Sequence, residues 1–171
     1  MSNTSNPEQQ DAVKKLKELI DQIDMCLFCT NLKTNDGSTT RPMSTAQVDD
    51  NGDIWFMSGK DSDKNKEIKK DSRVQLFYSH PGKSSYAVVN GTATLSEDKQ
   101  KIEELWTPLA KTWFKEGKDD PNISLIKVSG ITAYYWDTKG NRMINFFKMV
   151  ASVATGKTLV DAEQGELKVS R

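Results

Sequence analysis

One stretch of the chain, between positions 41 and 64, carries the side chains best suited to binding chemistry. Arg41 lies at its beginning, and Ser62 and Lys64 lie at its end, where a short helix is expected to start. A phosphomonoester carries about two negative charges, and proteins bind it with arginine or lysine, hydroxyls and the amides of a helix N-terminus. The stretch therefore predicts an anion site.

The side chains from Arg41 onward alternate between the two faces of a predicted strand, and one of these faces would line the site. If they form a strand, Arg41, Met43 and Thr45 share one face, whereas Pro42 and Ser44 share the other. A cation and a hydroxyl then line the same face. The alternative is that the cations are ordinary solvated charges on the outside of a barrel and on a helix.

Cys26 and Cys29 form a Cys-x-x-Cys sequence that could indicate a redox or zinc site. Their surroundings indicate a buried strand, on which residues three apart point to opposite faces. The sequence has no second cysteine pair to complete a zinc site. We expect both thiols to be core side chains that bind no metal and form no disulfide.

The single histidine and the acidic run at residues 49–53 are expected to be structural. His80 stands beside Pro81 and Gly82 in a turn, which does not favour an essential role. The acidic run has the acids and the glycine of a calcium loop, but it lacks the spacing and the closing glutamate. A hairpin turn is the better interpretation, so no metal site is expected.

The composition limits the class of partner. The 171 residues include 24 Lys and Arg and 24 Asp and Glu, so no net charge attracts nucleic acid or an anionic membrane. The N-terminal residues lack the features of a signal peptide, and no apolar stretch reaches bilayer length. We expect a cytoplasmic protein that binds a small molecule or another protein, with no nucleic acid and no membrane.

Helical and strand patterns place these residues in a mainly β architecture. Asn6, Pro7 and Gln9 have the pattern of a helix start, and apolar residues at helical spacing continue to Ile23. From Met25 onward, short apolar runs alternate with turn residues. The expected strands span about 26–32, 40–48, 53–58, 73–79, 86–95, 123–128 and 131–136.

Helices and turns are expected between these strands. Ser62 or Asp61 begins a short helix, and Ser96 begins another helix that Pro108 disturbs or ends. Gly91 within a strand indicates a bulge or a bend in a barrel wall. The other expected features are a surface loop at 114–122, a helix at 145–155 and a poorly anchored tail from position 156.

These elements predict a single domain over residues 1–171. It has an N-terminal helix at about 7–24, a barrel at about 25–137, and a C-terminal helix and tail at about 145–171. Many short antiparallel strands with a few helices favour a mainly β (α+β) barrel, closed or partly split, over a parallel sheet. The sequence has no Walker loop and no glycine-rich dinucleotide motif after a strand, so a nicotinamide cofactor would be only a passing electron donor.

The order of the motifs resembles that of the split β-barrel flavoproteins related to pyridoxamine 5′-phosphate oxidase, and in particular the general stress protein 26 group. The resemblance covers about residues 10 to 160 and rests on the order of the motifs rather than on any one of them. They are Arg41 to Thr45, Ile54 to Ser58, Ser62 to Lys64, Tyr86 to Gly91, Trp106 to Phe114, Lys118 to Pro121 and Tyr134 to Asp137.

The resemblance implies a split antiparallel β-barrel of Greek-key type with flanking helices, and a homodimer with FMN at the subunit interface. In that family an arginine-bearing strand lies beside the flavin, the next strand offers backbone polar groups to the ring, and a Ser-x-Lys segment holds the phosphate. A tryptophan aligned with Trp136 contacts the flavin from the neighbouring subunit. The FMN-binding residues implied here are Arg41, Met43, Ser44, Thr45, Phe56, Met57, Ser58, Ser62, Lys64, Trp113 and Trp136.

The sequence departs from the oxidases where those enzymes recognise their substrate. The Ser-Arg-Lys of the oxidases reads Ser62-Asp63-Lys64, which removes one phosphate cation. Their substrate-facing lysine is replaced by Ala46 or Gln47, and their Arg-Leu-His reads Arg142-Met143-Ile144. The helix that carries a substrate-phosphate arginine reads Trp106-Thr107-Pro108. Oxidation of pyridoxamine phosphate is therefore not expected.

The resemblance implies an FMN-binding general stress protein that is a flavin-dependent oxidoreductase of unknown substrate, served by a small-molecule electron donor or acceptor. Two alternatives remain open: a non-catalytic flavin-binding or redox-sensing stress protein, and a deazaflavin-dependent reductase. A haem-binding barrel is disfavoured because His80 stands in a turn and haem iron usually takes a histidine. No catalytic residue is assigned.

Overall fold

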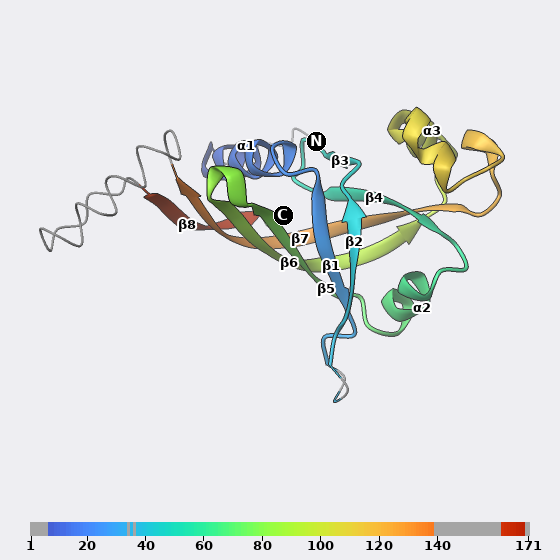
Figure 1. Cartoon of the computed structure of the whole chain (residues 1–171), viewed down its shortest axis with the longest axis horizontal. Helices are drawn as coiled ribbons and strands as arrows, with labels where there is room; N and C mark the ends of the chain where they lie inside the picture. Colours follow the sequence, from blue (N-terminus) through green and yellow to red (C-terminus); the bar gives the residue numbers. More distant parts are fainter. Residues whose placement is uncertain (1–6, 34, 36, 139–161, 170–171) are drawn as a thin grey trace, which may run out of the picture.

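A curled antiparallel sheet forms the body of the protein in the computed structural model, which describes residues 7–33, 35, 37–138 and 162–169 (Figure 1). Within these residues the sheet has eight strands, in the order β2-β1-β5-β6-β7-β4-β3, with β8 paired to β7. The strands are β1 (Met25–Thr30), β2 (Thr39–Ser44), β3 (Gln47–Val48), β4 (Ile54–Gly59), β5 (Arg73–His80), β6 (Ser85–Ser96), β7 (Ile123–Thr138) and β8 (Ala162–Val169).

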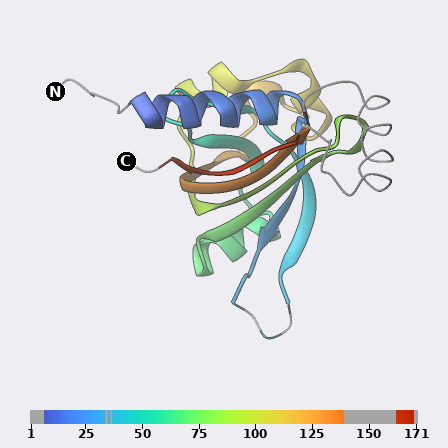
Figure 2. The same cartoon turned by 90° about the vertical axis from the view of Figure 1, so that its left-hand side faces the viewer.

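Helices flank the sheet, and α1 lies across one end of it (Figure 2). None of the described helices is long and apolar enough to cross a membrane. The helices are α1 (Pro7–Asp21), α2 (Asp63–Lys70) and α3 (Lys99–Leu105), with short 3₁₀ helices η1 (Pro81–Lys83), η2 (Pro108–Thr112) and η3 (Gly117–Asp119).

The sheet curls because the strands at the two ends of its order, β2 and β3, are separated in the chain only by Thr45 and Ala46. The amide of Thr45 donates to the carbonyl of Asp24, and the amide of Ala46 donates to the carbonyl of Trp55, both at 2.8 Å. Beyond Trp55, no described strand pairs with β4 on this side. The barrel is therefore split between β2 and β4, as the sequence predicted.

The main core lies inside the curled sheet and beneath α1. Phe28 on β1 meets Phe56 on β4 edge to face, with ring centroids 5.1 Å apart and ring planes at 87°. Leu16 and Ile20 of α1 are buried against the same cluster. The predicted apolar stripe of the first helix therefore packs on the barrel.

A second, smaller core lies where α3, η2 and Phe114 cover the start of β7. Phe114, which the sequence analysis placed in a polar surface loop, is buried here. Trp55, Met57 and Trp106 pack at the border of this core. Its buried members are Ile102, Leu105, Ala110, Phe114, Ile123 and Leu125.

The cap of α3 differs from the prediction. Asp98, not Ser96, is the capping residue, because its carboxylate accepts from the amides of Gln100 and Lys101 at 2.9 and 3.2 Å. The hydroxyl of Ser96 accepts from the amide of Asp98 at 3.2 Å and so stabilises the preceding turn. A carboxylate that reaches two amides outcompetes a hydroxyl two residues earlier.

The last two predicted strands are one continuous strand, β7, and the bulge predicted at Gly91 explains why it can bend without ending. The register between β6 and β7 shifts between Asn90 and Thr92. Opposite this shift, Gly130 has a φ of +63°, which a glycine adopts without strain. The bulge prediction is confirmed, whereas the predicted break after residue 128 is wrong.

The C-terminal prediction also needs correction. Residues 162–169 form β8, which pairs with Ile131–Thr138, so this part of the chain is not an unanchored tail. Backbone pairing with β7 anchors this segment, and its polar sequence lacks the apolar pattern from which a strand is predicted. The predicted cap at Asn6 and the predicted helix at 145–155 lie outside the described residues.

Two residues assigned to turns do stabilise turns. The carboxylate of Asp49 accepts from the amides of Asn51 and Asp53 at 2.9 and 3.0 Å, which confirms the predicted hairpin between β3 and β4. Nδ1 of His80 accepts from the amide of Lys83 at 3.2 Å and caps η1.

Cys26 and Cys29 on β1 are buried free thiols. Burial, opposed by a hydrogen bond with Tyr78, raises the pKa of Cys26 to about 12.

Candidate functional site

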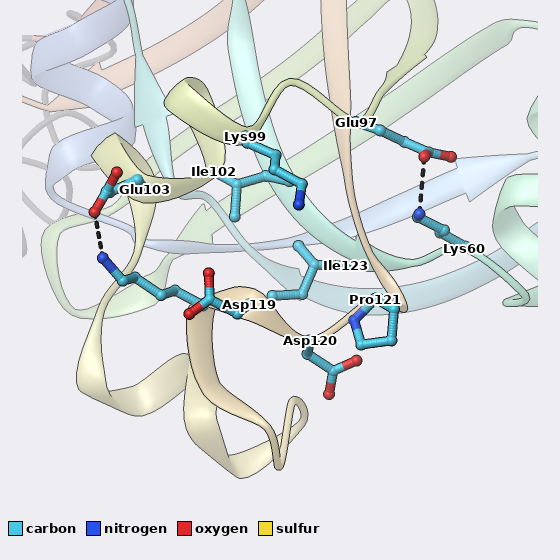
Figure 3. A pocket seen from close by; sticks show the side chains of 10 residues that line it. Lys60, Glu97, Lys99, Ile102, Glu103, Asp119, Asp120, Pro121 and Ile123 are labelled. Carbon is cyan, nitrogen blue, oxygen red and sulfur yellow. Dashed lines mark hydrogen bonds and ion pairs between the residues drawn. The ribbon is translucent and has the colours of Figure 1, made fainter.

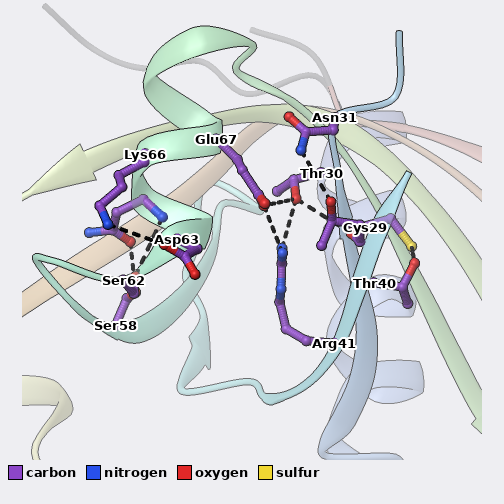
Figure 4. Close-up of polar contacts among 12 residues, drawn as sticks. Cys29, Thr30, Asn31, Thr40, Arg41, Ser58, Ser62, Asp63, Lys66 and Glu67 are labelled. Atoms are coloured by element: carbon purple, nitrogen blue, oxygen red, sulfur yellow. Dashed lines mark hydrogen bonds and ion pairs between the residues drawn. The ribbon is translucent and has the colours of Figure 1, made fainter. Parts of the chain in front are cut away.

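Hydrogen bonds among buried and partly buried side chains fix the N-terminus of α2 against β4 and β7, and Figure 4 shows their end at Ser58 and Ser62. Ser62 caps the helix, and its Oγ accepts from the amide of Asn65 at 3.4 Å. Ser58 lies 3.2 Å from the Ser62 hydroxyl and donates to Oδ1 of Asn65 at 2.7 Å. Nδ2 of Asn65 donates to Ser124 at 2.9 Å, and Ser124 donates to the carbonyl of Ser58 at 3.1 Å. The predicted Ser62 cap is confirmed.

Arg41 reaches from β2 to α2 and is held there by two partners (Figure 4). Its Nη2 donates to Oε2 of Glu67 at 2.6 Å, and its Nη1 donates to Oγ1 of Thr30 at 2.7 Å. Thr30 donates to the same Glu67 oxygen at 2.5 Å. The side chains of Arg41 and Glu67 are 21% and 17% exposed, so solvent screens their attraction weakly. Arg41 therefore faces α2 and is not a solvated charge outside the barrel.

The electrostatics keep this ion pair charged at neutral pH. Burial would raise the pKa of Glu67, but hydrogen bonds from Thr30 and Arg41, together with the charge of Arg41, outweigh burial and hold the pKa below its usual value. A guanidinium has more N–H groups than these two bonds use. Arg41 therefore keeps donors for a further acceptor.

Lys64 lies in the first turn of α2, half-buried and close to Arg41. Burial, and then the positive charge of Arg41, lower the pKa of its ammonium group. Within the described part of the chain, no hydrogen bond or ion pair holds its Nζ, whereas Lys66 on the same helix pairs with Asp63 at 3.1 Å. A half-buried cation that faces another cation and lacks a carboxylate of its own favours an anion.

Backbone edges of β2 and β4 flank the split beside these cations. β2 pairs only with β1 among the described strands. The carbonyl of Trp55 faces β3, so by alternation the amide and carbonyl of Met57 also face that side, where no described strand pairs with them. Such edges offer hydrogen-bond donors and acceptors to a planar heterocycle.

The other predicted FMN-binding residues on and next to β2 and β4 differ in where their side chains lie. The side chains of Met43 and Phe56 belong to the main core. By the same alternation, the backbone of Met43 faces β1 and that of Phe56 faces β7, so neither residue presents its own groups to the split. Ser44 is exposed on the opposite face of β2. Oγ1 of Thr45 lies 2.8 Å from the hydroxyl of Tyr78, which is buried.

The two predicted tryptophans lie elsewhere on the molecule. Trp136 is 47% exposed and stands opposite Tyr86 on the outer face of the sheet. Trp113 is 68% exposed and follows η2. Within the described residues, neither has a hydrogen bond or ring contact with Arg41 or Lys64. The structure therefore brings together the phosphate-binding candidates but not these aromatic ones.

Apolar side chains form a row across the outer face of the sheet, which we call the outer apolar row. Leu27 on β1, Phe77 on β5, Val88 on β6 and Tyr134 on β7 stand directly opposite one another. Leu27, Phe77 and Tyr134 are 38 to 50% exposed. Pro42 on β2 stands opposite Leu27, so the row reaches the strand that carries Arg41.

Sequence reasoning missed four residues that position the site. Asn65 occupies the third helical position after the Ser62 cap, where a side chain can fold back on the cap, and this position was the available signal. Glu67 lies in a run of charged residues and resembles its solvated neighbours. Thr30 and Ser124 lie in predicted strands, and nothing in the sequence distinguishes them from other strand hydroxyls.

A cavity of about 340 Å³ lies between α3, η3 and the loop before α2 (Figure 3). Lys60 pairs with Glu97 at 2.8 Å on one side of it, and Lys118 pairs with Glu103 on the other. None of the predicted cofactor residues lines this cavity. Its charged groups largely neutralise one another, so it does not match the anion site.

Comparisons with known proteins show which family the sequence matches. The profile of the family described as pyridoxamine 5′-phosphate oxidase like matches residues 11–161. The protein bli-3 of Neurospora crassa is 26% identical over 152 residues, which cover 78% of this chain and 73% of that protein.

Solved structures have the same fold. A general stress protein 26 from Jannaschia sp. CCS1 matches with a TM-score of 0.76 at 24% identity, over 92% of this chain and 98% of that one. A general stress FMN/FAD binding protein from Xanthomonas citri matches with a TM-score of 0.58 at 24% identity, over 75% of this chain and 89% of that one.

Proposed function

Because the chain belongs to the pyridoxamine 5′-phosphate oxidase-like family, we propose that it binds FMN and is a general stress protein with flavin-dependent oxidoreductase activity on a substrate still to be identified. In this proposal Arg41, Lys64 and the Ser62 hydroxyl bind the phosphate together with the amides of α2. The backbone of β2 and β4 binds the polar edge of the ring. The bound flavin supplies the electron transfer, and the protein orients it and excludes water.

One observation carries this proposal: Lys64 is half-buried beside Arg41 and has no anionic partner among the described residues. Placing two cations together is unfavourable unless a ligand compensates them. A phosphate monoester fits, since it brings about two negative charges and several acceptor oxygens. The names of similar structures, which include an FMN/FAD binding protein, support a flavin as the carrier of that phosphate.

We further propose that the protein is a symmetric homodimer that closes over the flavin. The outer apolar row exposes apolar side chains that a second copy related by a two-fold axis would bury. It adjoins β2, so a second copy seated on it lies near the split. Trp136 and Tyr86 continue the exposed aromatic surface beyond the row, which is consistent with a tryptophan reaching the flavin of the other subunit.

The binding proposal is tested by the visible spectrum of the purified protein and by titration with FMN and riboflavin. We expect an FMN spectrum or stoichiometric FMN uptake, with riboflavin bound more weakly because it lacks the phosphate. A deazaflavin spectrum would support the alternative reductase. Equal affinity for FMN and riboflavin would contradict the assignment of Arg41 and Lys64 to the phosphate.

Turnover is tested anaerobically by following bleaching of the FMN-loaded protein. We expect negligible reduction by pyridoxine phosphate, because a second phosphate has few cations here and each charged contact is worth roughly 1.5–3 kcal/mol. Reduction by NADH, NADPH or another small donor is expected. If no donor reduces the flavin, a non-catalytic flavin-binding protein is the better description.

A further inference from the structure

Arg41 is held by a closed triangle of hydrogen bonds that joins three elements. Thr30 on β1 and Glu67 on α2 both bond the guanidinium, at 2.7 and 2.6 Å, and they bond each other at 2.5 Å. The guanidinium cannot turn away from α2 unless it breaks both of its bonds. The triangle therefore fixes the orientation of Arg41 before any ligand arrives.

The hydrogen bonds to Thr30 and Glu67 hold Arg41 near Lys64 although the two positive charges repel each other. Burial, and then the positive charge of Arg41, lower the pKa of Lys64, so the two cations repel each other. An arginine at the edge of a sheet could relieve the repulsion by swinging into solvent, where it would be better hydrated. Glu67 opposes that movement because it offers a partly buried carboxylate on the helix that carries Lys64.

We propose that Glu67, supported by Thr30, is a positioning residue of the phosphate site: it keeps the Arg41 guanidinium beside Lys64 and thereby sets the preference for a phosphorylated flavin over the same flavin without phosphate. The inference rests on the proposed function. Glu67 acts through Arg41 and need not touch the ligand. Its contribution is preorganisation, since an arginine that is already ordered loses less freedom on binding.

The opposite role for Glu67 makes an opposite prediction. A carboxylate close to a phosphate site also repels the phosphate, and if repulsion dominated, removing Glu67 would strengthen FMN binding. The substitution Glu67→Gln separates the two roles, because glutamine keeps an acceptor oxygen for Arg41 but has no charge. Glu67→Ala removes both the charge and the acceptor.

The experiment measures the affinities of the full-length protein for FMN and riboflavin and compares their ratio between variants. We expect Glu67→Ala to weaken FMN binding by about tenfold and to leave riboflavin binding unchanged, because only the phosphate depends on Arg41. Glu67→Gln should stay within about threefold of the wild type for both ligands. Glu104→Ala, which removes an exposed ion pair with Lys101 on α3, is the matched control and should leave the ratio unchanged.

Thr30→Val provides a second variant in case Glu67→Ala does not fold. It keeps the shape of the side chain and removes the hydroxyl that bonds both Arg41 and Glu67. Like Glu67→Ala, it should therefore lower the affinity for FMN relative to that for riboflavin.

Three outcomes of Glu67→Ala overturn the inference. Higher FMN affinity would assign Glu67 the repulsive role. Unchanged FMN affinity would show that Arg41 does not need Glu67 to bind the phosphate. An equal loss for FMN and riboflavin would show a general structural role. These outcomes refute only the inference, whereas wild-type protein that binds neither flavin would refute the proposed function as well.

Discussion

At the scale of single residues, Lys64 is half-buried close to Arg41 and has no hydrogen bond or ion pair among the described residues. We predict that Lys64→Ala weakens FMN binding by about 1–3 kcal/mol, the range for a lost charge-assisted hydrogen bond. Lys66→Ala is the matched control, because Lys66 lies on the same helix but pairs with Asp63 in solvent. A fluorescence titration in which both variants bind like the wild type would remove Lys64 from the site.

The pH dependence of binding tests the same residue in another way. The pKa of Lys64 lies below that of an ordinary lysine, so in the free protein its charge is lost at lower pH than usual. Phosphate binds the protonated form, and its own second ionisation is complete above about pH 7. FMN affinity should therefore fall as the pH rises through the pKa of Lys64. In Lys64→Arg this fall should disappear, and titrations at several alkaline pH values with an equal slope in both proteins would contradict the prediction.

The sequence could suggest those site residues whose side chains are suited to binding an anion by their type alone. Arg41, Ser62 and Lys64 were predicted as donors for a phosphate; the structure places Arg41 close to Lys64 and Ser62 at the cap of the same helix as Lys64, and their binding of a phosphate stays a prediction. Glu67 could not be predicted, because its partner Arg41 is 26 residues away and only the curl of the sheet brings the two together. A charge on a helix surface looks the same in sequence whether or not a distant strand supplies its partner.

At the scale of elements, the position of α2 depends on Asn65. Its side chain bonds Ser58 and Ser124, and both serines are buried. We predict that Asn65→Ala lowers the free energy of unfolding by about 1–3 kcal/mol, because it leaves buried hydroxyls without their partner. Urea denaturation measures this loss. Lys69→Ala on the exposed side of α2 should change stability by much less, and equal effects of the two substitutions would argue against the buried network.

The bulge between β6 and β7 depends on Gly91. A Cβ at this position would lie 2.7 Å from Cγ1 of Val128 and 2.9 Å from the carbonyl of Ser129. We predict that Gly91→Ala lowers the free energy of unfolding by about 1–3 kcal/mol through overpacking. In Gly59→Ala the new Cβ would meet only the flexible end of Asn122 at 3.3 Å, so this control should be nearly neutral in the same denaturation experiment. Equal stability of both variants and the wild type would contradict the overpacking argument.

Most local hydrogen-bond patterns were predicted, although the cap of α3 is Asp98 and not Ser96, whereas features that depend on strand pairing were missed. The Ser62 cap and the Asp49 hairpin are local hydrogen-bond patterns, and both are present. The continuity of β7 and the existence of β8 depend on backbone pairing with distant strands. Glycine at position 130 looks like a strand end in sequence, but β6 pairs with β7 on both sides of it.

At the scale of the whole molecule, the outer apolar row should decide whether the protein is a dimer. We predict that Phe77→Lys, which puts a charge at the centre of the row, gives a folded monomer with weakened FMN binding. Leu109→Lys is the control, because Leu109 is also an exposed apolar residue, at 65% against 38% for Phe77, but lies on η2, away from the row. Sedimentation should show a dimer for the wild type and the control. A wild-type monomer that holds FMN tightly would exclude closure by a second subunit.

β7 divides one of its sides between two partners, with β4 along its first half and β8 along its second half. Loss of β8 would leave the backbone of Ile131–Thr138 open on that side, a length of eight residues. An open edge of this length is a template on which strands from other molecules can add. We therefore expect a protein cut before Ala162 to associate edge to edge through β7, which gives β8 the role of covering that edge.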